Sequence, residues 1–229
     1  MSDVSREEIV TTHGTALALR WIVCLVGFAV NSFGIVLITK GALGTGPISA
    51  VPYVLSLRFE AVSFGVFTFA INMLFVVIQV ALLRRDFRAR DLLQVVANVF
   101  FSVCIDLSTA VLAGLSPEGL VARLAVVVLG CAVLALGIVL ELAPDIMVVP
   151  GEGIVRTISR VSGVAFATCK NAFDLTLAAV ALVLSLVFFG TVRGLGLGTI
   201  VSAVLIGRFV ALIDGHTPIT EKVSALRDV

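Results

Sequence analysis

Residues 121–142 read VARLAVVVLGCAVLALGIVLEL, a run that is apolar almost throughout. A run of about 20 apolar residues can cross the hydrocarbon layer of a bilayer, about 30 Å thick, as one α-helix. Five more runs of this kind occur along the chain, at Trp21–Thr39, Ser63–Leu83, Leu92–Leu112, Phe166–Phe189 and Thr199–Ile213. The sequence therefore predicts an all-α polytopic membrane protein with about six transmembrane helices.

The composition excludes several classes of protein. Hydrophobic residues make up 59% of the chain and charged residues only 14%, whereas about 25% of the residues in a soluble domain are charged. The net charge is +1 and the basic residues are spread over the connections, so we expect no nucleic-acid partner. The four cysteines occur singly, without the spacing of a metal or redox site. We expect no enzyme activity, no cofactor and no metal.

Two shorter segments differ from the six runs. They are Gly41–Arg58, which reads GALGTGPISAVPYVLSLR, and Ala143–Gly163, which reads APDIMVVPGEGIVRTISRVSG. Each contains glycine and proline near its beginning and then stays largely apolar for about three helical turns, too short to cross a bilayer. We interpret both segments as re-entrant half-helices.

The basic residues indicate how the spans are oriented. Cytoplasmic loops near the ends of spans hold most of the lysine and arginine in membrane proteins. If neither short segment crosses, the cluster RRDFRAR at residues 84–90 falls on the same side as the N-terminus. We therefore predict that both termini are cytoplasmic, with a lead-in at residues 1–20, a single membrane domain at residues 21–214 and a tail at residues 215–229.

The two halves of the membrane domain resemble each other. A shift of 103 residues places Gly27, Ala29, Val30, Gly34, Ile35, Val36 and Leu37 on Gly130, Ala132, Val133, Gly137, Ile138, Val139 and Leu140. The same shift places Pro47 on Pro150, and a shift of 108 places Phe101, Ile105 and Asp106 on Phe209, Ile213 and Asp214. The repeats cover about residues 21–112 and 121–214. Because each has three spans, an odd number, the second enters the membrane the other way up, as an inverted 3+3 repeat. The alternative is chance similarity between leucine-rich and valine-rich helices.

The first candidate site is the pair of glycine and proline turns at the beginnings of the two half-helices. Proline suits the first turn of a helix, and neighbouring glycines let backbone amides face a cavity, where the helix N-terminus attracts anions. The candidate substrate-binding residues in these segments are Gly44, Thr45, Gly46, Pro47, Ser49, Gly151 and Glu152. A tight connection between helices would use the same residue types, so that alternative stays open.

The second candidate site lies in the fifth span. Lys170 and Asp174 are four residues apart on one helical face, and Asn171 is beside them. Ionisable side chains inside a membrane usually face a partner or a water-filled path. Together with Glu152 they would carry one net negative charge, so we predict Glu152 and Asp174 as the residues that bind a coupling proton or cation. A structural salt bridge is the alternative.

Four short motifs suggest a family. They are LGTGP at Leu43–Pro47, PGEGIV at Pro150–Val155, Lys170 with Asp174, and LGLGTIVSAVLIGR at Leu195–Arg208. In this order the chain resembles the YitT/YczE-like family of small bacterial integral membrane proteins. The resemblance implies a location in the bacterial plasma (inner) membrane. In that family a tryptophan and an acidic residue often follow the first proline, where this chain has Ile48 and Ser49.

The sequence favours a membrane transporter or exporter of a small anionic or zwitterionic solute. Such a solute would bind near the midplane, between the two half-helix N-termini, with a proton as a candidate coupling ion. Two alternatives are a substrate-binding subunit without a transport cycle and an accessory or regulatory membrane protein. The expected partners are the solute and membrane lipid. Glycines spaced by seven residues also permit close helix packing, within one bundle or in a homodimer.

Overall fold

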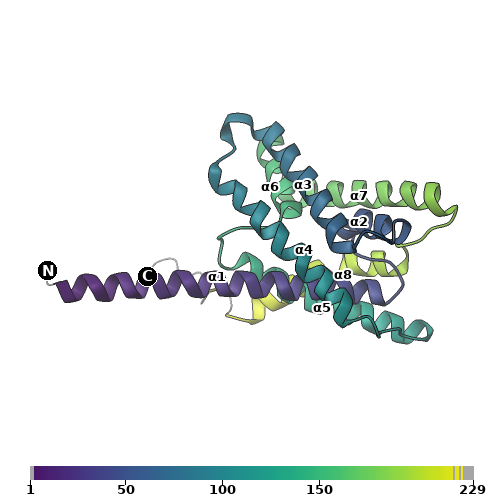
Figure 1. Ribbon diagram of the computed structural model, residues 1–229, viewed down its shortest axis with the longest axis horizontal. Coiled ribbons are helices and arrows are strands. Elements are labelled where there is room, and N and C mark those ends of the chain that lie inside the picture. The colour runs from purple at the N-terminus through teal and green to yellow at the C-terminus, as the bar shows by residue number, and fades with distance from the viewer. Residues whose placement is uncertain (1–2, 219, 222, 224–229) are drawn as a thin grey trace.

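The computed structural model describes residues 3–218, 220, 221 and 223, and all regular structure in that part of the chain is helical (Figure 1). Two short 3-10 turns, η1 (Arg84–Asp86) and η2 (Ala89–Leu92), connect α3 to α4. The α-helices are α1 (Asp3–Lys40), α2 (Pro47–Arg58), α3 (Phe64–Leu83), α4 (Leu93–Val111), α5 (Gly119–Leu142), α6 (Pro150–Ser162), α7 (Phe166–Phe189) and α8 (Leu197–His216). The predicted tail at 215–229 lies partly outside the described residues.

Six helical segments are long and apolar enough to cross a membrane, which confirms the prediction of a multi-pass helical membrane protein. These segments are Gly14–Lys40, Phe64–Asp86, Leu93–Val111, Gly119–Leu142, Phe166–Phe189 and Leu197–His216. Large apolar side chains cover much of the outer surface; Leu175 and Val187 on α7 are 72% and 71% exposed. Such a surface suits contact with lipid.

The beginning of α1 differs from the predicted boundary. The helix begins at Asp3 and continues without a break into the first span. Residues 3–20 contain no proline, and one glycine inside a helix costs only about 1 kcal/mol, so nothing in this stretch ends the helix. From Asp3 on, the predicted lead-in is therefore part of the same helix as the first span, and its cytoplasmic location stays a prediction.

The two short helices α2 and α6 have 12 and 13 residues. At 1.5 Å per residue each is about 20 Å long, which is less than the thickness of the hydrocarbon layer. Proline occupies the first turn of each, Pro47 in α2 and Pro150 in α6, as predicted. Their beginnings meet: an added Cβ at Gly151 would lie 3.4 Å from Cγ2 of Ile48. That they are re-entrant stays a prediction.

Helices α1 and α5 cross closely through four glycines, two on each helix. An added Cβ on any of them would lie closer than 3.0 Å to backbone of the facing helix, for Gly27 at Glu141, for Gly34 at Leu134, for Gly130 at Ile38 and for Gly137 at Asn31. The partner's number falls as the glycine's number rises, so the two helices run antiparallel. The glycines spaced by seven residues therefore pack within one chain.

The remaining helices surround this crossing. In Figure 1, α4 runs obliquely across α1, and α3 lies beside α4. Helix α4 packs against α1 and α8 packs against α5, while α2 packs against α7 and α6 packs against α3. One hydrophobic core lies between α1, α4 and α5, and a second lies between α2, α6 and α7. Helix α3 also contacts α4, whereas α7 with α8 is not among the pairs in extensive contact in the described chain.

Candidate functional site

A cavity of about 650 Å³ lies where α2 and α6 begin, and all eight helices contribute to its wall. Eight of the ten predicted substrate-binding residues line it: Gly46, Pro47, Ser49, Gly151, Glu152, Lys170, Asn171 and Asp174. Asn171 and Asp174 come from α7, more than 100 residues after Ser49 in the sequence. The structure thus brings the two predicted sites together in one place.

Gly44 and Thr45 are not part of the cavity wall. Gly44 has a φ of +109°, which favours glycine, and it packs against Thr199 at the beginning of α8. The carbonyl of Leu43 accepts a hydrogen bond of 2.7 Å from the Gly198 N–H, which ties this connection to α8. Thr45 is fully buried, and its Oγ1 has no hydrogen-bond partner among the described residues. Gly44 therefore positions the beginning of α2 from outside the cavity.

The beginning of α2 presents backbone to the cavity. Its N-cap residue, Gly46, is extended, no side chain caps the helix, and its first turn holds no acidic residue. In this first turn Pro47 has no N–H and the Ser49 N–H donates to the Gly46 carbonyl at 3.1 Å, while the helix dipole adds a partial positive charge. The first polar side chain in α2 is that of Ser49, which is 8% exposed and lines the cavity.

Glu141 lies at the beginning of α6. This residue is 1% exposed and lines the cavity from the end of α5. Its Oε2 accepts a hydrogen bond of 2.8 Å from Asn31 Nδ2, and its Oε1 accepts one of 3.1 Å from the N–H of Val149. Sequence reasoning missed Glu141, although a carboxylate within a predicted span was itself a signal. Glu141 therefore places an internal anion beside the N-cap residue of α6, Val149.

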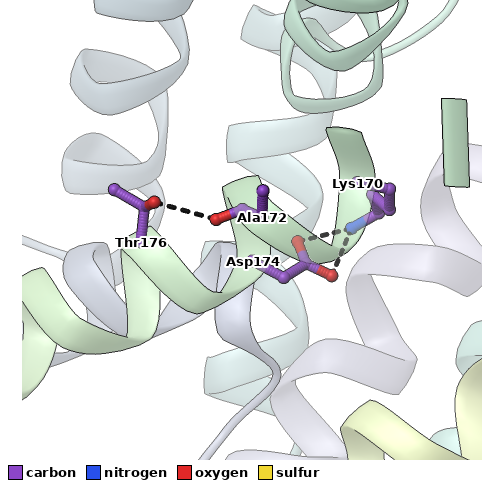
Figure 2. A network of polar contacts seen from close by, with 4 residues as sticks. All are labelled: Lys170, Ala172, Asp174 and Thr176. Carbon is purple, nitrogen blue, oxygen red and sulfur yellow. Dashed lines mark hydrogen bonds and ion pairs between the residues drawn. The ribbon is translucent and has the colours of Figure 1, made fainter. Parts of the chain in front are cut away.

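Lys170 and Asp174 form an ion pair along α7 (Figure 2). The Nζ of Lys170 lies 2.6 Å from Oδ1 and 2.7 Å from Oδ2 of Asp174. The two side chains are 24% and 25% exposed, and both residues line the cavity. Thr176, farther along α7, instead donates to the carbonyl of Ala172 and does not line the cavity. The predicted contact on one helical face is thus present.

Glu152 follows the beginning of α6 and faces the same cavity. Its side chain makes no hydrogen bond or ion pair with the rest of the described chain. Helix α6 lies outside the six candidate spans. Burial raises the pKa of the Glu152 carboxyl, Lys170 lowers it, Asp174 raises it and Arg156 lowers it. Glu152 is therefore a carboxylate that is available to a ligand or a proton.

The charged wall of the cavity carries one net negative charge when every group is ionised. Three carboxylates, Glu141, Glu152 and Asp174, face two cations, Arg156 and Lys170. Arg156 is exposed and also lines a neighbouring cavity of about 130 Å³ that contains Asp91 and Asp145. The wall therefore has a small negative excess beside the uncapped beginning of α2.

Side-chain amides hold α6 against α3 and α4. Gln79 Nε2 donates to Gln94 Oε1 at 3.2 Å and to the carbonyl of Pro150 at 3.4 Å. Asn72, which lines the cavity, donates to Asn98 Oδ1 at 2.8 Å. Hydrogen bonds between amides commonly join helices in membranes. The bond from Gln79 to Pro150 joins the beginning of α6 to α3, and the other two bonds join α3 to α4.

Comparison with known proteins identifies a family. The model of a family of unknown function, DUF6198, matches residues 18–215, which include all eight predicted residues of the cavity wall. Neither the curated proteins nor the solved structures contain a match. The YitT/YczE naming has no support from these comparisons and stays a prediction. Because the match covers most of the sequence, the chain belongs to the family of unknown function DUF6198.

Proposed function

We propose that this protein is a membrane transporter or exporter of a small anionic or zwitterionic solute. The observation that carries the proposal is the single cavity lined by the beginnings of both short helices and by the charged residues of α7. Secondary transporters commonly bind substrate where helix N-termini of two half-helices point at it. A volume of about 650 Å³ lies within the usual range for small-molecule sites, about 300–1,000 Å³.

The α1–α5 crossing supports the proposed inverted repeat. Applying the shift of 103 residues to the contact between Gly27 and Glu141 gives Gly130 and Ile38, which are also in contact. The contact between Gly34 and Leu134 becomes the contact between Gly137 and Asn31 in the same way. The crossing thus maps onto itself, and equivalent helices run in opposite directions.

Two pairs of contacts between the other helices agree with this repeat. If α1 to α4 correspond to α5 to α8, the contact of α2 with α7 corresponds to that of α6 with α3. The contact of α1 with α4 likewise corresponds to that of α5 with α8. Both members of each pair occur. In this proposal α2 and α6 are re-entrant, both termini are cytoplasmic and the protein lies in a bacterial inner membrane.

The negative excess of the cavity supports a coupled proton. A carboxylate that is buried without a full set of partners favours its protonated form, and Glu152 is such a group. Glu152 and Asp174 are the candidate coupling residues, because both face the cavity and share Lys170 as a neighbouring cation.

A non-transporting accessory or regulatory role is the second candidate. The observation in its favour is that both oxygens of Asp174 are already engaged by Lys170, as in a purely structural ion pair. In that case Lys170 would contribute to folding and not to ligand binding. A substrate-binding subunit and a homodimer also stay predictions.

The first experiment is thermal unfolding of the purified protein against a panel of anionic and zwitterionic metabolites. A ligand at about 100 times its dissociation constant should stabilise the protein by about 2.7 kcal/mol. We expect a ligand-dependent shift that is lost in Lys170→Ala and kept in Thr176→Ala, the matched control on α7. Uptake or efflux of that ligand in proteoliposomes then separates transport from binding. An unchanged shift in Lys170→Ala, or binding without flux, would favour the second candidate.

A further inference from the structure

The charged groups of the cavity differ in whether they already have partners. Lys170 is held by both oxygens of Asp174. Glu141 is held by Asn31 and by the N–H of Val149. Glu152 makes no hydrogen bond or ion pair within the described part of the chain. A carboxylate in this position can pair with the cationic group of a ligand.

The beginnings of α2 and α6 differ in the negative charge that lies beside them. At α6, Glu141 accepts from a backbone N–H, and Glu152 stands in the first turn. Neither helix has a side-chain cap, but the first turn of α2 holds no acidic residue. The beginning of α2 therefore lacks the anion that Glu141 supplies to α6.

The difference arises at equivalent positions of the two halves. The shift of 103 residues places Ile38 on Glu141 and Asn31 on Leu134, and all four residues line the cavity. The hydrogen-bonded pair Asn31 and Glu141 faces α6, whereas its counterpart at α2 is the apolar pair Leu134 and Ile38. The cavity wall beside α6 thus contains an internal anion, whereas the equivalent positions beside α2 are apolar.

From this asymmetry we infer that the ligand is an amphipathic zwitterion. Its ammonium group pairs with Glu152, its carboxylate takes the place at the beginning of α2 that Glu141 occupies at α6, and its apolar body lies against Ile38 and Leu134. An α-amino acid or dipeptide with an apolar side chain has this chemistry. A simple anion would leave Glu152 without a direct ion pair, and a simple cation would leave the α2 N-terminus unused. The inference rests on the proposed function and narrows its substrate class.

Binding of three matched compounds tests the inference. The probes are the dipeptide phenylalanyl-leucine, its methyl ester, which lacks the anion, and its N-acetyl derivative, which lacks the cation; phenylalanine and its two derivatives form a smaller series. A charge-assisted hydrogen bond contributes about 1.5–3 kcal/mol, so we expect each derivative to bind at least about tenfold more weakly than its zwitterion. Calorimetry on the full-length protein in lipid nanodiscs measures this.

Two variants test which part of the protein binds the ammonium group of the ligand and which part binds its carboxylate. Glu152→Gln should weaken binding of the zwitterion at least about tenfold and leave the affinity for the N-acetyl compound unchanged. The double variant Ile38→Glu with Leu134→Asn places beside α2 the same polar pair that Glu141 and Asn31 form beside α6. It should weaken binding of the zwitterion and of the N-acetyl compound but not binding of the ester. Unfolding temperatures of both variants, with Glu118→Gln as an exposed control, show whether they fold.

The outcomes separate this inference from the proposed function. If the zwitterion and the N-acetyl compound bind equally and Glu152→Gln has no effect, the inference of a zwitterionic ligand is overturned. The proposal of a transporter for an anionic solute is then unaffected. Preferential binding of the ester overturns both the inference and the anionic branch of the proposal. Binding of none of these compounds overturns the inference alone, because the wider metabolite panel tests the proposed function independently.

Discussion

Gly151 lies against Ile48, so that the first turn of α6 contacts the first turn of α2 next to the cavity. An added Cβ at Gly151 would be 3.4 Å from Cγ2 of Ile48, an ordinary van der Waals distance. Gly151→Ala should therefore unfold near the wild-type temperature. Gly151→Leu should overpack this contact and cost about 1–3 kcal/mol. Thermal unfolding of the two variants checks this prediction, and equal unfolding temperatures would show that the two helices separate easily.

The α1–α5 crossing should be sensitive to single methyl groups. Gly34→Ala and Gly137→Ala each place a Cβ on backbone of the facing helix, so each should destabilise the protein by about 1–3 kcal/mol. Gly14→Ala is the matched control on α1, because nothing lies within 4 Å of its added Cβ. Chemical denaturation of the three variants measures the difference. A loss in Gly14→Ala as large as in Gly34→Ala would contradict the close crossing.

Glu141 should be required for folding. Glu141→Ala leaves Asn31 Nδ2 and the N–H of Val149 without their acceptor, and each unsatisfied buried donor costs about 1–3 kcal/mol. Glu141→Gln keeps one carbonyl acceptor and should lose less. The exposed Glu118, in the connection before α5, provides the control variant Glu118→Ala. Unfolding curves that do not differ between Glu141→Ala and the control would refute this role.

The proposed topology, with both termini cytoplasmic and α2 and α6 re-entrant, predicts which positions react with a membrane-impermeant thiol reagent applied from outside. Cysteines replacing Ser116, between α4 and α5, and Glu60, between α2 and α3, should be labelled. Cysteines replacing Arg88, between η1 and η2, and Val164, between α6 and α7, should not. All four positions are exposed. If α2 crossed the bilayer, Glu60 would change sides. The native cysteines are mostly buried, and the unmodified protein serves as the blank.

The spans and the short helices were predictable because length and hydropathy determine them locally. The apolar runs gave the positions of α3, α4, α5 and α7 to within a few residues. Pro47 and Pro150 marked the first turns of α2 and α6. Helix α1 begins before the apolar run, at Asp3, because its polar first turns contain no signal that ends a helix.

The site was only partly predictable because its contacts join distant residues. The pairing of Asn31 with Glu141 spans 110 residues, and neither residue has a local motif that points to the other. The glycine spacing predicted close packing of helices but not the partner of each glycine. In contrast, Lys170 and Asp174 are one turn apart on α7, so the helical period alone predicted their contact.

The unequal contacts of the two halves have a consequence for how the cavity opens. Helix α3 packs against α4, whereas the equivalent α7 and α8 make no comparably extensive contact in the described chain. If the halves are copies, as proposed, exchanging their conformations would bring α7 and α8 together and part α3 from α4. The α1–α5 crossing, which maps onto itself, would be unchanged by this exchange. The structure would then be one of two alternative conformations in which the two halves exchange roles. Helices α1 and α5 would stay fixed between them, and the cavity would be accessible from one face of the bilayer in one conformation and from the other face in the second.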